Sequence, residues 1–166
     1  YLLSKQPLRS AEDIRGMKAW RLDREPITEV LFRKAGVVSV PLTIPDVLLG
    51  LQTNLIDVAY APPSAAIVLQ WFTRVQYVTE LPINYTIGAF LVEKRAFDRI
   101  AVNHQNVLKA VSRRHLRSLS IQIRDENREA VAVMKAHGLE FVAPDETGIN
   151  DFESLVDETI AELEGE

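Results

Sequence analysis

The residues best placed to do chemistry in this sequence stand in three short loops, each of which follows an apolar run. The loops cover Asp23 to Pro26, Leu42 to Pro45 and Ala61 to Ser64. Thr43 and Asp46 have the spacing of a capping box with an acid in the usual Glu position, and a proline in the third loop suits a first helical turn. Because free N–H groups at helix starts favour an anionic or carbonyl-bearing ligand, we expect these loops to bind one.

The sequence carries none of the strong enzyme signatures. It has no GxGxxG, Walker, GxSxG or HExxH motif, and it has no cysteine for thiolate chemistry or disulfides. His104 and His115 would share a helix face, but about three turns separate them, which is too far for one metal ion. Arg113, Arg114 and Arg117 beside them are typical of a solvated helix face. We therefore predict no enzyme, no cofactor and no metal site.

Residues 16–64 must position the three loops. They alternate short β-type runs with segments whose apolar residues recur at helical spacing, which predicts a β-α-β-α-β unit. Such a unit implies an α/β fold with a mostly parallel sheet, covered on both faces, whose ligands bind beyond the carboxyl ends of the strands. The expected strands are Lys18 to Leu22, Val37 to Val40 and Ile56 to Tyr60, and the expected helices are Pro26 to Ala35 and Pro45 to Thr53.

The rest of the chain predicts further strands and one unusually long helix. No Pro or Gly interrupts residues 103–137, so we expect a continuous helix of roughly 50 Å, longer than a small domain is wide. Such a helix should span two bodies. Residues 65–72 are predicted to form a helix that buries Val68 and Trp71, and Tyr85 to Val92 to form a strand with a hinge at Gly88.

Composition limits the classes of partner. The net charge of -4 and the pI of about 5.5 argue against a nucleic-acid ligand, and nine acids with no Lys or Arg in Asp145 to Glu166 indicate the solvated face of a terminal helix. No apolar run reaches about 18 residues, so no membrane-spanning helix is predicted.

Four runs together resemble the solute-binding proteins of tripartite ATP-independent periplasmic (TRAP) transporters, of which the dicarboxylate-binding branch is best known. The runs are SAEDIRGMKAWRL, KAGVVSVPLTIPDVLLGLQTNLIDVAYAPPSAA, NYTIGAFLVEKRAF and KAHGLEFVAP. The resemblance implies one lobe of a two-lobed clamshell of periplasmic-binding-protein type II. Because members of that family are longer than this chain, the resemblance also implies that the chain is their C-terminal half. Residues 1–86 and 125–166 would then form one lobe, and residues 87–124 would belong to the other, largely missing lobe.

The family's site residues transfer imperfectly. Its carboxylate-clamping Arg falls at Trp20, with Arg21 one place later, and its usual Asn before a proline falls at Ala61. We expect one extra residue in Asp23 to Glu25, which leaves Trp20 facing the pocket and Arg21 facing away; a bulge before Arg21 would instead restore the clamp. The expected ligand-binding residues are Trp20, Arg21, Asp23, Thr43, Tyr60, Ala61, Ser64, Asn84 and Thr86. Trp20 and Tyr60 could equally be core residues.

The function implied by the resemblance is a periplasmic receptor that captures a small organic solute, such as a carboxylate, for TRAP membrane permease subunits. The alternative is an effector-binding domain of a cytoplasmic transcription regulator with the same fold. An α/β enzyme is a third and weaker alternative. Apolar surface along Tyr85 to Val92 and Leu116 to Ile123 also predicts self-association of the chain.

Overall fold

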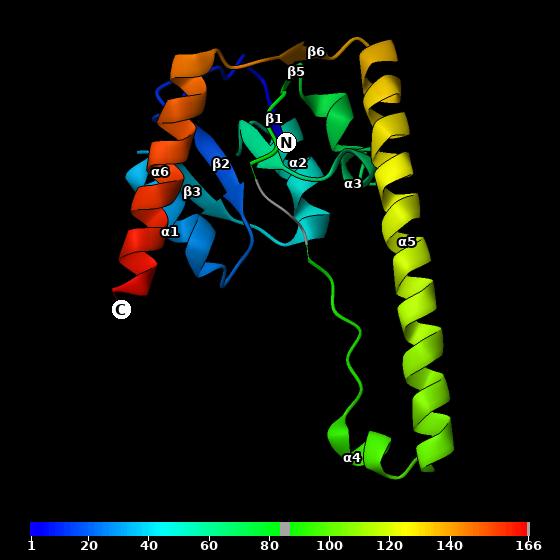
Figure 1. Ribbon diagram of the computed structural model, residues 1–166. Coiled ribbons are helices and arrows are strands. Elements are labelled where there is room, and N and C mark those ends of the chain that lie inside the picture. Colours follow the sequence, from blue (N-terminus) through cyan, green and yellow to red (C-terminus); the bar gives the residue numbers. More distant parts are fainter. Residues whose placement is uncertain (84–86, 166) are drawn as a thin grey trace.

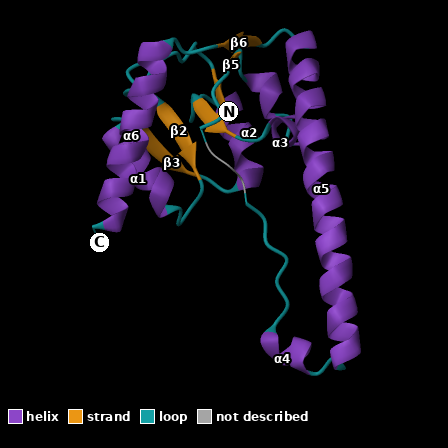
Figure 2. Cartoon of the chain, in the orientation of Figure 1, coloured by secondary structure: helices purple, strands orange, loops and turns teal. Residues whose placement is uncertain are grey.

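The computed structural model, which describes residues 1–83 and 87–165, consists of a sheet-centred body and a long arm (Figure 1). The body comprises residues 1–83 and 127–165. The arm comprises residues 87–126: an extended segment runs away from the body, turns at the short helix α4 (Lys94–Asp98), and returns along α5 (Val102–Ala136). Figure 2 shows the arm standing clear of the sheet and its covering helices.

Six short strands form one sheet in the order β3-β2-β4-β1-β5-β6. The neighbours β2 and β3, β2 and β4, and β5 and β6 are parallel, while β1 runs antiparallel to β4 and β5. The predicted mostly parallel α/β sheet is therefore confirmed, with β1 as the exception. The strands are β1 (Leu2–Ser4), β2 (Lys18–Arg21), β3 (Val38–Pro41), β4 (Val58–Tyr60), β5 (Tyr77–Thr79) and β6 (Glu140–Val142).

Helices cover both faces of the sheet, as a βαβ unit requires. On one face α1 (Pro26–Lys34) and α6 (Glu146–Glu164) enclose a core that includes Leu2, Phe32 and Phe152. The other face is covered by the 3₁₀ helix η1 (Ile44–Asp46), α2 (Val47–Gln52), α3 (Pro63–Val68), the 3₁₀ helix η2 (Trp71–Arg74) and the end of α5. The body therefore has two cores, one on each side of the strands.

The helix predicted over residues 65–72 is shorter than expected. Helix α3 ends at Val68, and Gln70 takes a left-handed conformation with φ of 60° before η2 begins. The turn breaks the 3.6-residue period, so Trp71 is buried as predicted, whereas Val68 is 79% exposed. The prediction that Val68 belongs to the core is wrong for this reason.

The long helix is confirmed: α5 has 35 residues without a break. Only its last turns join the body, where Ala130 and Met134 are buried against it. Leu116, Leu119 and Ile123 lie on the predicted apolar stripe but remain exposed in the arm. A stripe at helical spacing is buried only where another element packs against it.

The strand predicted at Tyr85 to Val92 is not formed in its described part. Residues 87–92 are extended but pair with no strand within the described part of the chain, and Ile87 is 90% exposed. A β-strand needs a neighbour to hydrogen-bond its backbone, and the arm offers none. The prediction of a hinge at Gly88 stays a prediction.

The acidic C-terminal segment forms α6, as expected. Asp145 caps it by accepting a hydrogen bond from the N–H of Gly148 at 2.8 Å. Gly148 also lies against the backbone of Arg9, where an added Cβ would stand 2.0 Å from the carbonyl oxygen. Side chains of Glu158 and Glu162 face Lys34 of α1, so some of the acids serve the α1–α6 contact.

Candidate ligand-binding site

The carboxyl ends of β2, β3 and β4 lie at one edge of the sheet, which we call the carboxyl edge. Trp20 pairs with Val40, and Arg21 with Pro41, in an unbroken parallel register. The loops that follow these strands contain Asp23, Thr43 and Ala61. The sequence prediction that three loops meet at one edge is therefore confirmed by the topology.

Trp20 lies beneath this edge as part of the core. Its indole is 5% exposed, stacks on Tyr60 at 4.8 Å between ring centroids, and meets Trp71 edge-on at 5.1 Å. Its N–H donates to the carbonyl of Leu42 at 2.9 Å. Since the indole has its hydrogen bond and Tyr60 covers one ring face, Trp20 forms the floor of the edge. Whether a ligand reaches it stays a prediction.

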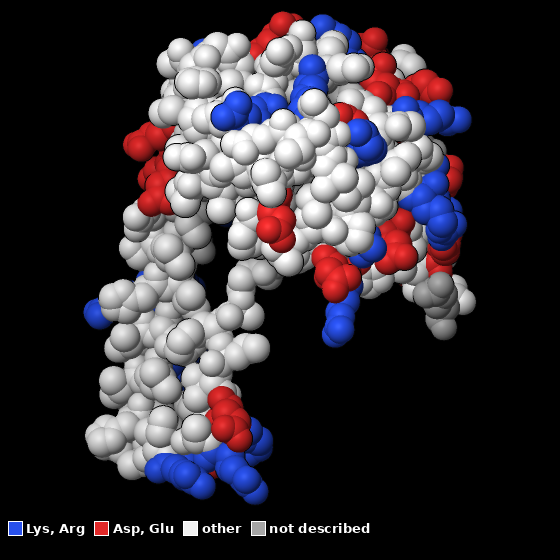
Figure 3. Space-filling view, turned by 180° about the vertical axis from the view of Figure 1, so that it is seen from behind, with Lys and Arg blue, Asp and Glu red and all other residues white. Residues whose placement is uncertain are grey.

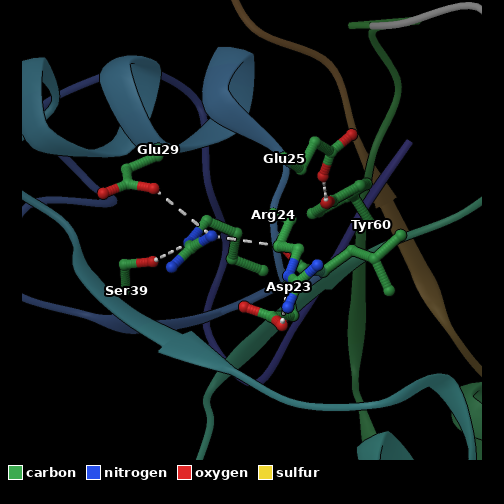
Figure 4. A network of polar contacts seen from close by, with 8 residues as sticks. Asp23, Arg24, Glu25, Glu29, Ser39 and Tyr60 are labelled. Atoms are coloured by element: carbon green, nitrogen blue, oxygen red, sulfur yellow. Dashed lines mark hydrogen bonds and ion pairs between the residues drawn. The ribbon is translucent and has the colours of Figure 1, made fainter.

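Arg21 points to the opposite face of the sheet from Trp20, as the alternation of a strand requires. Its Nε donates to Ser39 Oγ at 3.0 Å, and its Nη1 lies 3.4 Å from Glu29 Oε2 on α1 (Figure 4). The side chain is only 13% exposed. The pairing through Arg21 is unbroken, so the bulge that the alternative requires is not formed. Whether a ligand contacts Arg21 stays a prediction.

The loop after β2 contains a backbone conformation that is unusual for a residue with a side chain. Arg24 has φ of 58°, a left-handed conformation that is costly for a residue with a side chain. Its guanidinium and the carboxylate of Asp23 form a long, exposed ion pair at 3.8 Å. This is where an extra residue was expected, and the strained turn is consistent with it.

Tyr60 and Glu25 join the end of β4 to the loop after β2. The phenol of Tyr60 donates to Glu25 Oε2, although Glu25 is the N-cap residue of α1 and could have capped that helix (Figure 4). Burial raises the pKa of Tyr60 to about 12, with a further contribution from the hydrogen bond to Glu25. The phenol therefore stays protonated at neutral pH and acts as a donor.

The other predicted ligand residues are partly engaged within the protein. Thr43 donates to the side chain of Asp46 at 2.5 Å, so the expected capping box, which would bond backbone N–H groups, is not formed. The N–H and hydroxyl of Ser64 both donate to Asn127 Oδ1 of α5 at 3.0 Å. Ala61 is buried. Asn84 and Thr86 lie outside the described residues.

Sequence reasoning missed two residues of this region. Glu25 stands in a predicted site loop directly before a proline, so its place in the loop could have indicated it. Asn127 lies within a long helix, and no sequence signal connects it with Ser64.

Two hollows lie away from the carboxyl edge. One, of about 440 Å³, is in the arm between Phe90, Phe97 and Leu116. The other, of about 400 Å³, is lined mainly by apolar side chains of α1, α6 and residues 81–83. Within residues 1–83 and 87–165 no group of three or more His, Cys, Asp or Glu side chains is placed to hold a metal ion, and no helix is long and apolar enough to cross a membrane.

Comparison with known proteins supports the architecture. Residues 2–166 match the family model for bacterial extracellular solute-binding protein, family 7. A solute-binding protein of Verminephrobacter eiseniae (strain EF01-2) is 23% identical over 137 residues, which cover 82% of this chain and 40% of the relative.

Solved structures share the fold. A TRAP periplasmic solute-binding protein from Shewanella oneidensis with bound succinate has a TM-score of 0.85 at 15% identity. The match covers 99% of this chain and 54% of the Shewanella chain. One from Pseudomonas putida F1 with bound D-glucuronate has a TM-score of 0.80 at 22% identity, with 98% and 53% covered.

The chain therefore spans about half the length of these relatives. The family groups solute-binding proteins of transporters and not enzymes, and nothing in the comparisons supports a transcription regulator. Because the family match extends over residues 2–166, this chain belongs to the bacterial extracellular solute-binding proteins of family 7.

Proposed function

We propose that this chain forms part of an extracytoplasmic receptor that captures a small organic solute for a TRAP-type transporter. The match of the family model to residues 2–166 carries the proposal. The carboxyl edge of β2, β3 and β4 supplies the surface, because ligands of open α/β sheets bind beyond the carboxyl ends of the strands. Solved relatives contain succinate, D-glucuronate or sn-glycerol-3-phosphate, which are small polar anions.

The division into body and arm supports a two-lobed receptor. The body has its own cores on both faces of the sheet, whereas the arm exposes Phe90, Leu91, Leu116 and Leu119. We assign residues 1–86 and 125–166 to one lobe and residues 87–124 to the other. The solute would then lie between the lobes, against the carboxyl edge.

The proposed cellular setting follows from the family. We place the receptor in the periplasm and give it the membrane permease subunits of a TRAP transporter as partners. No catalytic step is involved, because release of an unchanged solute is all that such a receptor requires.

Binding by this chain can be tested by thermal unfolding with succinate, D-glucuronate, L-galactonate and sn-glycerol-3-phosphate. A solute that binds the native state and not the unfolded state raises the unfolding midpoint, and the stabilisation grows with the logarithm of its concentration over its Kd. We expect at least one solute to do so, and Tyr60→Phe to reduce the shift.

The matched control is Tyr77→Phe, which removes a phenol from β5 of the same sheet. It should leave the shift unchanged. The proposal fails if none of the solutes stabilises the chain, or if both substitutions reduce the shift equally.

A further inference from the structure

The one arginine on β2 is already engaged in holding the sheet to α1. Its guanidinium bonds Ser39 and the carbonyl of Leu22 and pairs with Glu29 of α1, which covers the face of the sheet away from Trp20. To grip a solute carboxylate at the carboxyl edge, Arg21 would have to leave these partners. A planar guanidinium binds a carboxylate strongly only when its N–H groups are presented side by side to it.

The carboxylate of Glu25 is turned to the edge instead. As the N-cap residue of α1, Glu25 makes no side-chain bond to the helix backbone. Its Oε2 accepts from Tyr60, and its Oε1 has no hydrogen-bond partner within residues 1–83 and 87–165. An acceptor oxygen is thus held in a fixed place beside a half-buried phenol.

The charge around this pair disfavours a second carboxylate. Asp23 and Glu25 flank Arg24 in the same loop, and Asp46 adds a carboxylate on the neighbouring loop. Arg24 is the only cation in the loop between β2 and α1, and its side chain is 92% exposed and already paired with Asp23. A solute group that donates hydrogen bonds suits this edge better than one that only accepts them.

We propose that Glu25 and Tyr60 make this lobe select the hydrogen-bond-donor end of the solute, a hydroxyl or an ammonium group, instead of its carboxylate. The ring of Tyr60, stacked on Trp20, gives the carbon skeleton of such a solute an apolar surface. The inference rests on the proposed function, and it concerns which part of the solute faces this lobe.

The test is an NMR titration of the isotopically labelled 166-residue chain with four probes: D-glucose, D-glucosamine, D-glucuronate and succinate. The three sugars share one ring and differ in a hydroxyl, an ammonium or a carboxylate group. We expect the sugars to shift the signals of Glu25 and Tyr60, with D-glucuronate binding no more tightly than D-glucose. Succinate should leave these signals in place.

The sugars also separate the two donor types. An affinity about tenfold higher for D-glucosamine than for D-glucose indicates an ammonium site, and similar affinities indicate a hydroxyl site. Glu25→Gln removes the charge but keeps the shape of the side chain. It should lower the affinity for D-glucosamine by about tenfold, or abolish the NMR shifts caused by D-glucose and D-glucosamine. Glu80→Gln, directly after β5, is the matched control and should change neither the affinity for D-glucosamine nor the NMR shifts that the sugars cause.

Two results would overturn this inference and leave the proposed function intact. In the first, succinate shifts the NMR signals of Glu25 and Tyr60, and Arg21→Lys abolishes that binding. In the second, Glu25→Gln binds every sugar as wild type does. If none of the four probes shifts the edge, the inference fails together with the proposal that this edge binds solute.

Discussion

Helix α5 contains two segments with opposite surroundings, and both carry apolar side chains. Its last turns, from Asn127 to Ala136, bury Ala130 and Met134 in the body and bond α3 through Asn127. Its first 25 residues, in the arm, expose Leu116 and Leu119. Figure 3, seen from behind, shows the arm largely white, with Lys and Arg side chains gathered at its tip.

The comparison shows that helical periodicity specifies which residues can be buried, and that a partner decides whether they are. The body supplies such a partner for α5 through α3 and β6, and the described arm supplies only α4 and the segment before it. Most of the stability of a helix in a protein comes from packing of its apolar face. The arm should therefore be the less stable region.

The largest expected effect separates the two segments of α5 directly. Met134 is 1% exposed, so Met134→Ala removes buried contacts and leaves a cavity, at a cost of about 2–5 kcal/mol. Leu116 is 43% exposed, and Leu116→Ala should change the free energy of unfolding by no more than about 0.5 kcal/mol. Urea unfolding of both variants measures the difference; equal losses would mean that the arm is packed as well as the body.

A smaller effect is expected at the polar contact between α5 and α3. Asn127→Ala leaves the N–H and hydroxyl of Ser64 without their acceptor, which should cost about 1–2 kcal/mol because the site is partly buried. Asn106→Ala, in the exposed arm, makes the same change in helix propensity without a lost contact. The difference between the two variants in urea unfolding isolates the contact, and no difference would show that it contributes nothing.

Alkaline pH should destabilise the body through Tyr60. Its pKa is raised to about 12 in the folded chain from about 10, so the native state binds the proton more tightly. The stabilisation is fully present below pH of about 10 and is lost as pH rises toward about 12, by at most about 2 kcal/mol for a half-exposed ring. Between about pH 10 and pH 12, Tyr60→Phe should make the free energy of unfolding depend less on pH than it does in wild type. Tyr77→Phe should leave that pH dependence as it is in wild type, and urea unfolding at a series of pH values measures both.

The smallest expected effect concerns association through the arm. Exposed Phe90, Leu91 and Leu119 predict weak self-association, detectable as a sedimentation coefficient that rises with concentration. Leu119→Lys should reduce that rise without lowering the stability of the body. A chain that stays monomeric at all concentrations would contradict this prediction.

The sequence predicted the elements of the body well, because its short apolar runs and its Gly and Pro residues mark local boundaries. Residues 18–60 gave three parallel strands and two helices within a few residues of their observed ends. The strand at Tyr85 to Val92 failed in its described part because pairing depends on a neighbour that no local pattern can supply.

The site was predicted in outline only. The strand order predicted that Thr43, Tyr60 and Arg21 lie near one edge of the sheet, and the period of a strand predicted the face to which Arg21 points. Their role in binding stays a prediction. The contacts between Tyr60 and Glu25, and between Ser64 and Asn127, join residues far apart in sequence, and their geometry depends on how loops and helices pack.

Native-state hydrogen exchange along α5 tests the central claim most directly, since each amide reports the stability of its own turn. We predict strong protection from about Asn127 to Ala136, close to that of the buried strands, and protection that falls steeply through the arm toward Val102. Uniform protection along all of α5 would contradict the claim that the body packs the end of α5, whereas the described arm offers the rest of the helix only α4 and the segment before it.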